Sequence, residues 1–219
     1  MFEQQTIMML LEGVRDTVYM TLASTLLGYL LGLPMGVLLA VTDKDGIHPN
    51  RAVYRVFDVI SNIVRSIPFL ILLILLIPFT RFVVGKSYGS TATIVPLVIT
   101  AAPYIARLVE SSLKEVDKGV IEAAKSMGAS NFDIIVHVLL LEARTSIITG
   151  ATIALGTILG YSAMAGTVGG GGLGDIAVRY GYYRWQTDIM IITVILIIFL
   201  FQIFQNSGMK IAKVVDRRK

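Results

Sequence analysis

Five long runs without a charged residue set the limits on how this chain can fold. They cover residues 17–42, 66–80, 87–106, 145–174 and 189–209. A bilayer hydrocarbon core is about 30 Å thick, so a helix that crosses it needs about 20 residues. Four runs meet that length, and the second meets it only if its helix begins before Arg65, near Val59. We therefore expect an all-α membrane protein with five spans.

The composition agrees with a membrane protein. Hydrophobic residues make up 55% of the 219 residues and charged residues only 16%, with a mean hydropathy of +0.75. Ordinary soluble domains are much less apolar. The expected spans cover residues 17–42, 59–80, 87–106, 145–166 and 189–209 of a single domain over 1–219. Met1 to Val14 is expected to form a short amphipathic helix on the outer face of the membrane.

The basic residues predict which way the chain crosses the membrane. Cytoplasmic loops carry an excess of Lys and Arg. If the segment 107–144 is cytoplasmic, 14 of the 19 basic residues lie inside or at the inner face. The N-terminus is then outside and the C-terminus is cytoplasmic. The net charge of +4 is a topology signal, and we expect no nucleic-acid partner because the basic residues form no stripe on one soluble domain.

Segment 107–144, between two apolar runs, predicts two short helices joined by a bend. Gly128 adopts a left-handed conformation without steric cost and so ends the first helix. Ser130 is suited to cap the second, with Asp133 near its positive end. Ala123 and Ala124 leave the first helix thin beside the charged Glu122. Spacing alone fits a generic amphipathic loop equally well.

This pattern resembles the EAA loop of ABC importer permeases, which reads Glu-Ala-Ala, three residues, Gly, nine residues, an aliphatic residue and then x-Leu-Pro. The matching positions here are Glu122, Ala123, Ala124, Gly128, Val138 and Leu140. Leu141 stands where the family has Pro. The resemblance implies a cytoplasmic loop that docks on an ATPase subunit, with Ala129 and Ser130 also at the contact.

Other segments resemble the permease subunit of methionine ABC importers, in the same order along the chain. They are Arg65–Phe69, Val95–Leu97, Ala101–Pro103, Ile105–Arg107, and Gly160–Met164 followed by a glycine run. The resemblance implies the type I ABC importer permease fold with a cytoplasmic coupling helix. It also implies a place in the cell membrane, a separate ATP-binding ABC ATPase and an extracytoplasmic substrate-binding protein, often a lipoprotein. We expect a homodimer, because five helices are few for enclosing a path and two copies supply ten around a two-fold axis. Alternating access would then be driven by ATP hydrolysis on the partner, with no cofactor on this chain.

Glycines mark two further places in the predicted spans. Gly28, Gly32 and Gly36 fall on one helix face and predict close packing inside the bundle. Gly156, Gly160 and Met164 share a face of the fourth span, and Gly156 and Gly160 would let the fourth helices of two copies approach each other. We expect Gly160, Ser162 and Met164 to line the translocation path, with Met164 as a gate. Ordinary core packing is the alternative for Met164.

The glycine run after the fourth span predicts a tight re-entry at the outer mouth. Gly169, Gly171 and Gly174 satisfy G-x-G-x-x-G, but a dinucleotide site needs a preceding strand, and this run follows a membrane helix. The sequence has no G-x-x-x-x-G-K-[ST] motif, so we expect no ATP bound through a P-loop.

Two other function classes are weighed against the importer. An ion-coupled secondary transporter usually has ionisable residues within its spans, and here only Arg65 lies in one, near its inner face. An enzyme needs catalytic or metal-binding clusters, and the two histidines, His48 and His137, are far apart in the sequence. We expect no metal site and no catalytic residues. Permeases for another amino acid or a small peptide remain an alternative.

Overall fold

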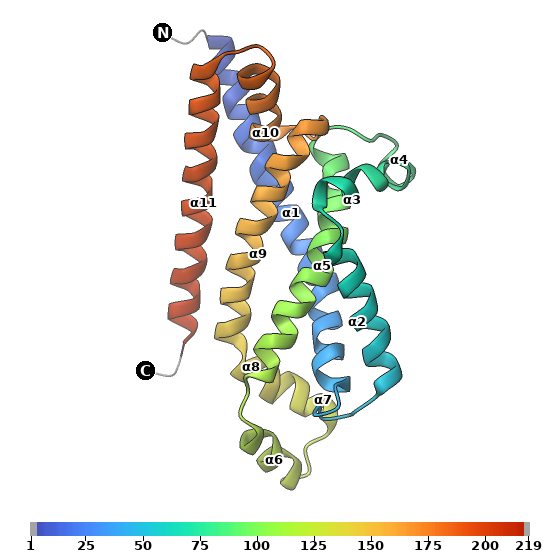
Figure 1. The fold of residues 1–219 in the computed structure, drawn as a ribbon. Helices are drawn as coiled ribbons and strands as arrows, with labels where there is room; N and C mark the ends of the chain where they lie inside the picture. Colours follow the sequence, from blue (N-terminus) through green and yellow to red (C-terminus); the bar gives the residue numbers. More distant parts are fainter. Residues whose placement is uncertain (1–3, 217–219) are drawn as a thin grey trace.

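The computed structural model describes residues 4–216, and all regular elements within them are helical. The chain forms an elongated bundle (Figure 1). The longer helices are α1 (Gln4–Thr42), α2 (Arg51–Ser66), α5 (Ser90–Lys114), α9 (Arg144–Ala165) and α11 (Thr187–Val215). The short ones are α3 (Phe69–Leu75), α4 (Ile77–Val84), α6 (Lys118–Ser126), α7 (Asn131–Asp133), η1 (Ile134–Leu139), α8 (Leu140–Glu142), η2 (Gly166–Val168), α10 (Gly172–Ile176) and η3 (Ala177–Tyr182).

The centre of the bundle is the contact between α1 and α5. A Cβ atom on Gly32 would lie 2.6 Å from the carbonyl oxygen of Ala102, and one on Gly36 would lie 2.6 Å from that of Ala106. Real Cβ atoms do not approach backbone this closely, so the glycines allow the two helices to touch. The predicted packing face at Gly28, Gly32 and Gly36 is confirmed.

Helix α1 is longer than the first predicted span. It runs without a break from Gln4 to Thr42 and passes through Pro34. The prediction of a separate surface helix over Met1 to Val14 is therefore wrong from Gln4 onward, and residues 1–3 lie outside the described part. The uncharged run begins only at Thr17, but the helical backbone continues through the charged residues that precede it.

The second predicted span is not one helix, which corrects the expectation over 59–80. Helices α2 and α3 meet at an angle of 102°. Ile67 is extended, with φ −87° and ψ 126°, and Pro68 follows it. A residue before proline avoids the α-helical region because of a clash with the proline ring, which accounts for the break. Helix α4 follows and ends at Val84, and the next residue, Gly85, caps it with a φ of +81°.

The last three expected spans are each represented by a long helix. Helix α5 extends to Lys114, so residues 107–114 are helical and the loop begins only after Lys114. Helix α9 is followed by η2, a glycine turn, α10 and η3, and the whole stretch from Arg144 to Tyr182 is long and apolar enough to cross a membrane. Four helical stretches in the described chain meet that test, or five if the bent pair α2–α3 counts as one span.

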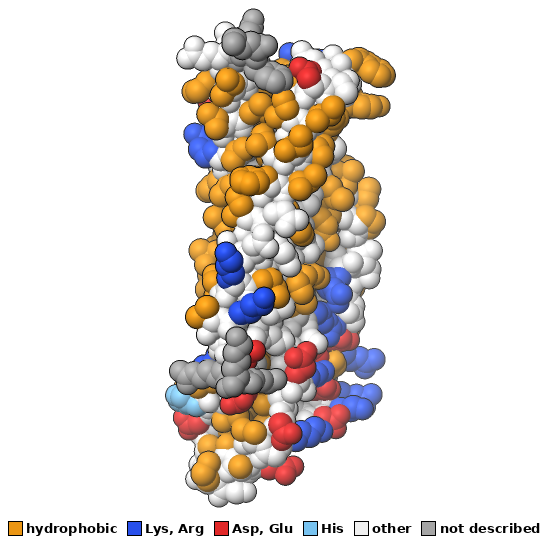
Figure 2. Space-filling view, turned by 90° about the vertical axis from the view of Figure 1, so that its left-hand side faces the viewer, with side chains coloured by type: hydrophobic (Ala, Val, Ile, Leu, Met, Phe, Trp, Pro, Cys, Tyr) orange, Lys and Arg blue, Asp and Glu red, His pale blue; other side chains and the backbone are white. Residues whose placement is uncertain are grey.

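Charge is distributed unevenly along the bundle. In Figure 2 hydrophobic side chains cover much of the upper part, and acidic and basic side chains gather at the lower part. The lower end in Figure 1 carries α6, α7 and α8. We call it the charged end. The opposite end carries the first turns of α1 and the connection from η3 to α11 (Figure 1).

Candidate functional site

The predicted two-helix loop lies at the charged end and is joined closely to α5. Only residues 115–117 separate the last residue of α5, Lys114, from the first residue of α6, Lys118. Asp117 caps α6, because its side chain accepts a hydrogen bond from the Gly119 amide at 2.7 Å. An aspartate at this position satisfies an otherwise free amide and complements the positive end of the helix.

The bend between the two helices is formed as the sequence predicts. Gly128 has φ +84° and follows the last turn of α6. Its amide donates to the Lys125 carbonyl at 3.0 Å, and the Ala129 amide donates to the Ala124 carbonyl at 3.1 Å. These bonds satisfy carbonyls at the helix end in the manner of a Schellman-type cap. The left-handed conformation predicted for Gly128 is confirmed.

The second helix begins with a capping box. The Asp133 amide donates to Ser130 Oγ at 3.2 Å, and the Ser130 amide donates to Asp133 Oδ2 at 3.3 Å. The Ser130 hydrogen bonds lower the pKa of Asp133 below its ordinary value. Asp133 is therefore ionised at neutral pH and keeps the cap. The helix continues through the π-helical stretch Ile134–Leu139.

The six predicted coupling residues do not all face the same way. Glu122, Ala123, Gly128 and Ser130 are exposed and Ala129 is half-buried, whereas Ala124 is buried against the chain itself. Ala123 alone therefore provides the small surface beside Glu122. Ala124 instead belongs to the hydrophobic core that also includes Ile134 and Leu139.

Exposed apolar side chains lie beside these residues and were missed by the sequence reasoning. Val120 and Met127 are 43% and 83% exposed, and Phe132 in α7 is 70% exposed. Val120, Ala123 and Met127 are spaced three and four residues apart, so they share one face of α6. That spacing was the signal that could have identified them. These three residues form an apolar surface, which we call the α6 face, and Phe132 is exposed in the helix that follows the bend.

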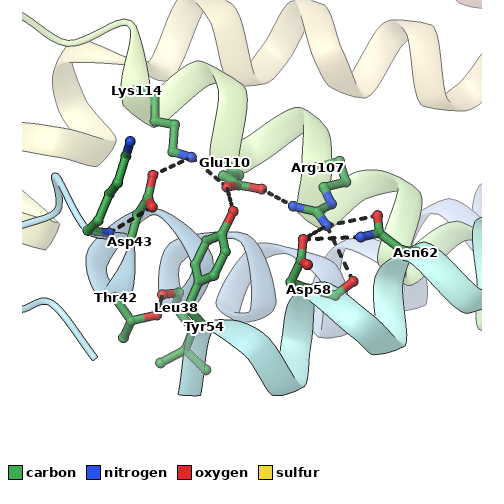
Figure 3. Close-up of polar contacts among 10 residues, drawn as sticks. Leu38, Thr42, Asp43, Tyr54, Asp58, Asn62, Arg107, Glu110 and Lys114 are labelled. Atoms are coloured by element: carbon green, nitrogen blue, oxygen red, sulfur yellow. Dashed lines mark hydrogen bonds and ion pairs between the residues drawn. The ribbon is translucent and has the colours of Figure 1, made fainter. Parts of the chain in front are cut away.

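A network of ion pairs near the charged end connects α5 to α2 (Figure 3). The Arg107 guanidinium donates to the carboxylate of Asp58 in α2 and to Asn62 Oδ1, the latter at 3.0 Å. Its other terminal nitrogen donates to Glu110 Oε2 at 2.7 Å. Glu110 is only 5% exposed. A carboxylate this deep requires charged partners, since burial without them is costly.

The same network extends to the end of α1. Lys114 Nζ lies 2.7 Å from Glu110 Oε1 and 2.7 Å from Asp43 Oδ2. The Tyr54 hydroxyl of α2 donates to Glu110 Oε1 at 3.5 Å. The hydrogen bond from Lys114 lowers the pKa of Asp43. Because its folded pKa is lowered, Asp43 stabilises the fold above the ordinary pKa of aspartate, and this contribution is lost as the pH falls through the lowered value.

The three predicted path residues are separated by the structure. Met164 is 52% exposed and nothing lies within 4 Å of the Cβ position of Gly160, so both face outward. Ser162 is 1% exposed and its hydroxyl donates to the Leu159 carbonyl at 2.7 Å, which places it inside the chain and away from that face. A Cβ on Gly156 would lie 2.7 Å from Phe201 of α11. Gly156 therefore packs against α11 of the same chain, whereas the sequence analysis expected it to contact the second copy.

Comparisons with known proteins agree with this arrangement. A family model described as "binding-protein-dependent transport system inner membrane component" matches residues 32–218. The probable D-methionine transport system permease protein MetI of Vibrio cholerae is 48% identical over 210 residues, which are 96% of this chain and 93% of the relative. D-methionine transport system permease protein MetI of Escherichia coli K12 is 51% identical over 158 residues, 72% of this chain and 73% of the relative.

Solved structures give the same result. A structure described as an inward facing conformation of the MetNI methionine ABC transporter superposes with a TM-score of 0.97 at 45% identity, over 99% of this chain and 100% of that one. A more distant amino acid ABC transporter shares the fold, with a TM-score of 0.70 at 21% identity. The matched residues include α5, the two-helix loop and the α9–α11 region. The chain belongs to the family of inner membrane components of binding-protein-dependent transport systems.

Proposed function

We propose that this chain is the permease subunit of an ATP-driven methionine importer. The observation that carries the proposal is the similarity along almost the whole chain to relatives named as D-methionine permeases and to a methionine ABC transporter structure. The permease itself has no P-loop motif. Its task is transport, and ATP hydrolysis belongs to a separate subunit.

The ATPase subunit docks at the charged end in this proposal. The supporting features are the exposed Glu122 beside the apolar α6 face, and the bend at Gly128, whose φ is positive. The centres of protein interfaces are typically apolar and surrounded by polar groups, which fits this arrangement. Two permease copies related by a two-fold axis would each hold one ATPase subunit, and the superposition on the MetNI structure supports this assembly.

The orientation follows from the charges. Most Lys and Arg residues flank the charged end, so that end is cytoplasmic by the positive-inside rule. The N-terminus is then extracytoplasmic and the C-terminus cytoplasmic. In this proposal a substrate-binding protein delivers methionine at the extracytoplasmic face. The description of the matching family as binding-protein-dependent supports a partner of this kind.

Transport would proceed by alternating access between two conformations. Met164 and Gly160 are candidates for the path, since both are exposed on α9. A flexible thioether fills irregular gaps well, and Met164 would close the path when it faces the cytoplasm.

Reconstituted uptake tests the proposal. Vesicles that contain this permease with its neighbouring ATPase and binding protein should accumulate labelled methionine only when ATP is supplied. Unlabelled D-methionine, L-methionine and short Met-containing peptides, added in turn as competitors, would define the substrate. Accumulation driven by a proton gradient without ATP would contradict the proposal and indicate a secondary transporter. Uptake of another amino acid in preference to methionine would correct the substrate alone.

A further inference from the structure

Aromatic side chains gather on the connection from η3 to α11, at the end opposite α6. We call residues 182–185 the aromatic loop; it contains Tyr182, Tyr183, Arg184 and Trp185. The three aromatic residues are 64%, 69% and 85% exposed, respectively. Trp185 is the only tryptophan of the chain. The coupling site lies at the other end of the bundle and makes no use of this loop.

The aromatic loop is held in place by backbone hydrogen bonds. The Tyr183 amide donates to the Val178 carbonyl at 3.0 Å, and the Gln186 amide donates to the Tyr180 carbonyl at 3.2 Å. The Trp185 backbone has φ +57°, a left-handed conformation that is uncommon for a bulky residue. Arg184 stacks over the Tyr180 ring at 4.5 Å. The turn thus keeps large, amphipathic rings on the surface.

Large apolar side chains are exposed on the helices that lead to this end. On α11 they are Ile191, Val194, Ile195 and Ile198, and on the start of α1 they are Ile7, Met8 and Leu11. Helix α11 is the most apolar candidate span of the described chain, and little of it is buried within the chain. A helix that is this apolar and this exposed is expected to be surrounded by lipid. The aromatic loop immediately precedes it.

We propose that the aromatic loop is a membrane anchor that lies in the lipid headgroup layer at the end of the bundle opposite α6. Tyr and Trp are enriched at membrane–water interfaces because their rings are apolar and their tips are polar. Arg184 provides a cation for lipid phosphates. Arg179 lies one turn earlier and is paired with Asp175 at 2.8 Å, so it adds little net charge. The anchor fixes the depth of α11 in the bilayer.

Tyr, Trp and Arg are also common in the centres of protein interfaces, so a soluble protein is the competing occupant. The continuity of the loop with the exposed apolar faces of α1 and α11 favours lipid, because a bilayer covers both helices and the loop at once. The proposal requires only that the chain crosses a membrane. It stands or falls separately from the methionine transport proposed above.

Fluorescence of Trp185 tests the anchor in the assembled transporter, reconstituted in phosphatidylcholine nanodiscs. The signal of Trp185 is obtained by subtracting the spectrum of the Trp185→Phe variant, which removes any contribution from the ATPase. Lipids brominated near the headgroup should quench it more strongly than lipids brominated near the chain ends. Iodide in the water should quench it weakly, and its emission should lie at shorter wavelength than that of free tryptophan in water.

A matched control places a tryptophan in the exposed connection between α1 and α2, as His48→Trp in the Trp185→Phe background. It should be quenched by iodide and not by brominated lipid. If Trp185 is quenched by iodide and not by brominated lipid, as the control is, the anchor proposal is wrong. If Trp185 is protected from iodide only after a purified binding protein is added, the loop is a protein docking site instead. Stronger quenching by deep than by shallow bromines would also overturn the headgroup placement.

Discussion

Gly128 is the residue on which the shape of the two-helix loop depends most. Its φ of +84° is a conformation that costs other residues roughly 1–2 kcal/mol. We expect Gly128→Val to distort the bend and reduce ATP-driven uptake strongly while the membrane spans stay folded. Gly128→Asn is the matched control, because Asn tolerates this conformation, and it should keep most of the activity. Equal uptake by both variants would show that the bend is not needed for coupling.

Met164 gives a second prediction at the scale of a single residue. If its exposed side chain closes the path, Met164→Ala should let small solutes leak through vesicles without ATP. Met190→Ala is the control, since Met190 packs against Gly181 within the chain and should not cause leakage. The measurement is efflux of a trapped labelled amino acid. A sealed Met164→Ala permease with normal uptake would assign Met164 to packing instead.

The residue-scale predictions that succeeded depend on local sequence. Gly128 and the Ser130–Asp133 capping box act through backbone groups within three residues of themselves, so their neighbours in the sequence determine the outcome. Whether Ala123 or Ala124 faces outward depends on where the core lies. The sequence therefore predicted the loop shape correctly but gave the wrong side for Ala124.

At the scale of helices, the ion-pair network of Glu110 is the strongest test of how α5 is held. Glu110→Gln removes a buried carboxylate that neutralises both Arg107 and Lys114. Breaking a buried ion pair by removing one partner costs about 3–5 kcal/mol in general, and less is expected here because Asp58 and Asp43 remain. We therefore expect a lower melting temperature and a lower ratio of uptake to ATP hydrolysis.

Asp45→Asn is the control for the Glu110 variant. Asp45 lies in the exposed connection after α1 and outside the network. Its replacement by Asn also removes one negative charge. It should leave both the melting temperature and the uptake ratio unchanged. A Glu110→Gln permease with the stability and the uptake ratio of the Asp45 control would show that the network does not hold α5 in the way described.

Two features at this scale lay beyond the sequence reasoning for different reasons. The i, i+3 and i+7 spacing of Arg107, Glu110 and Lys114 was visible, but their partners Asp58 and Asp43 are distant in sequence, so only the folded structure brings them together. The break between α2 and α3 had a local signal, Pro68. Membrane helices often tolerate proline, and this made a continuous span over 59–80 the natural prediction.

For the whole molecule, the orientation in the membrane is the prediction with the widest consequences. The sequence contains no cysteine, so a thiol reagent labels this chain only at a cysteine that is introduced. Cysteine at Lys86 should react with an impermeant thiol reagent in intact cells, and cysteine at His48 or Lys213 should react only after the membrane is opened. All three side chains are exposed in the described structure. The reverse pattern would invert the topology and move α6 outside the cell.

The short connection between α5 and α6 limits how the assembled transporter can move. Between Lys114 and Lys118 there are only four Cα–Cα steps, and a fully extended chain of that length reaches at most about 14 Å. The link is short, and ion pairs join α5 to Asp43 at the end of α1 and to Asp58 in α2. A partner that moves α6 by more than this link can extend must therefore also move the membrane helices.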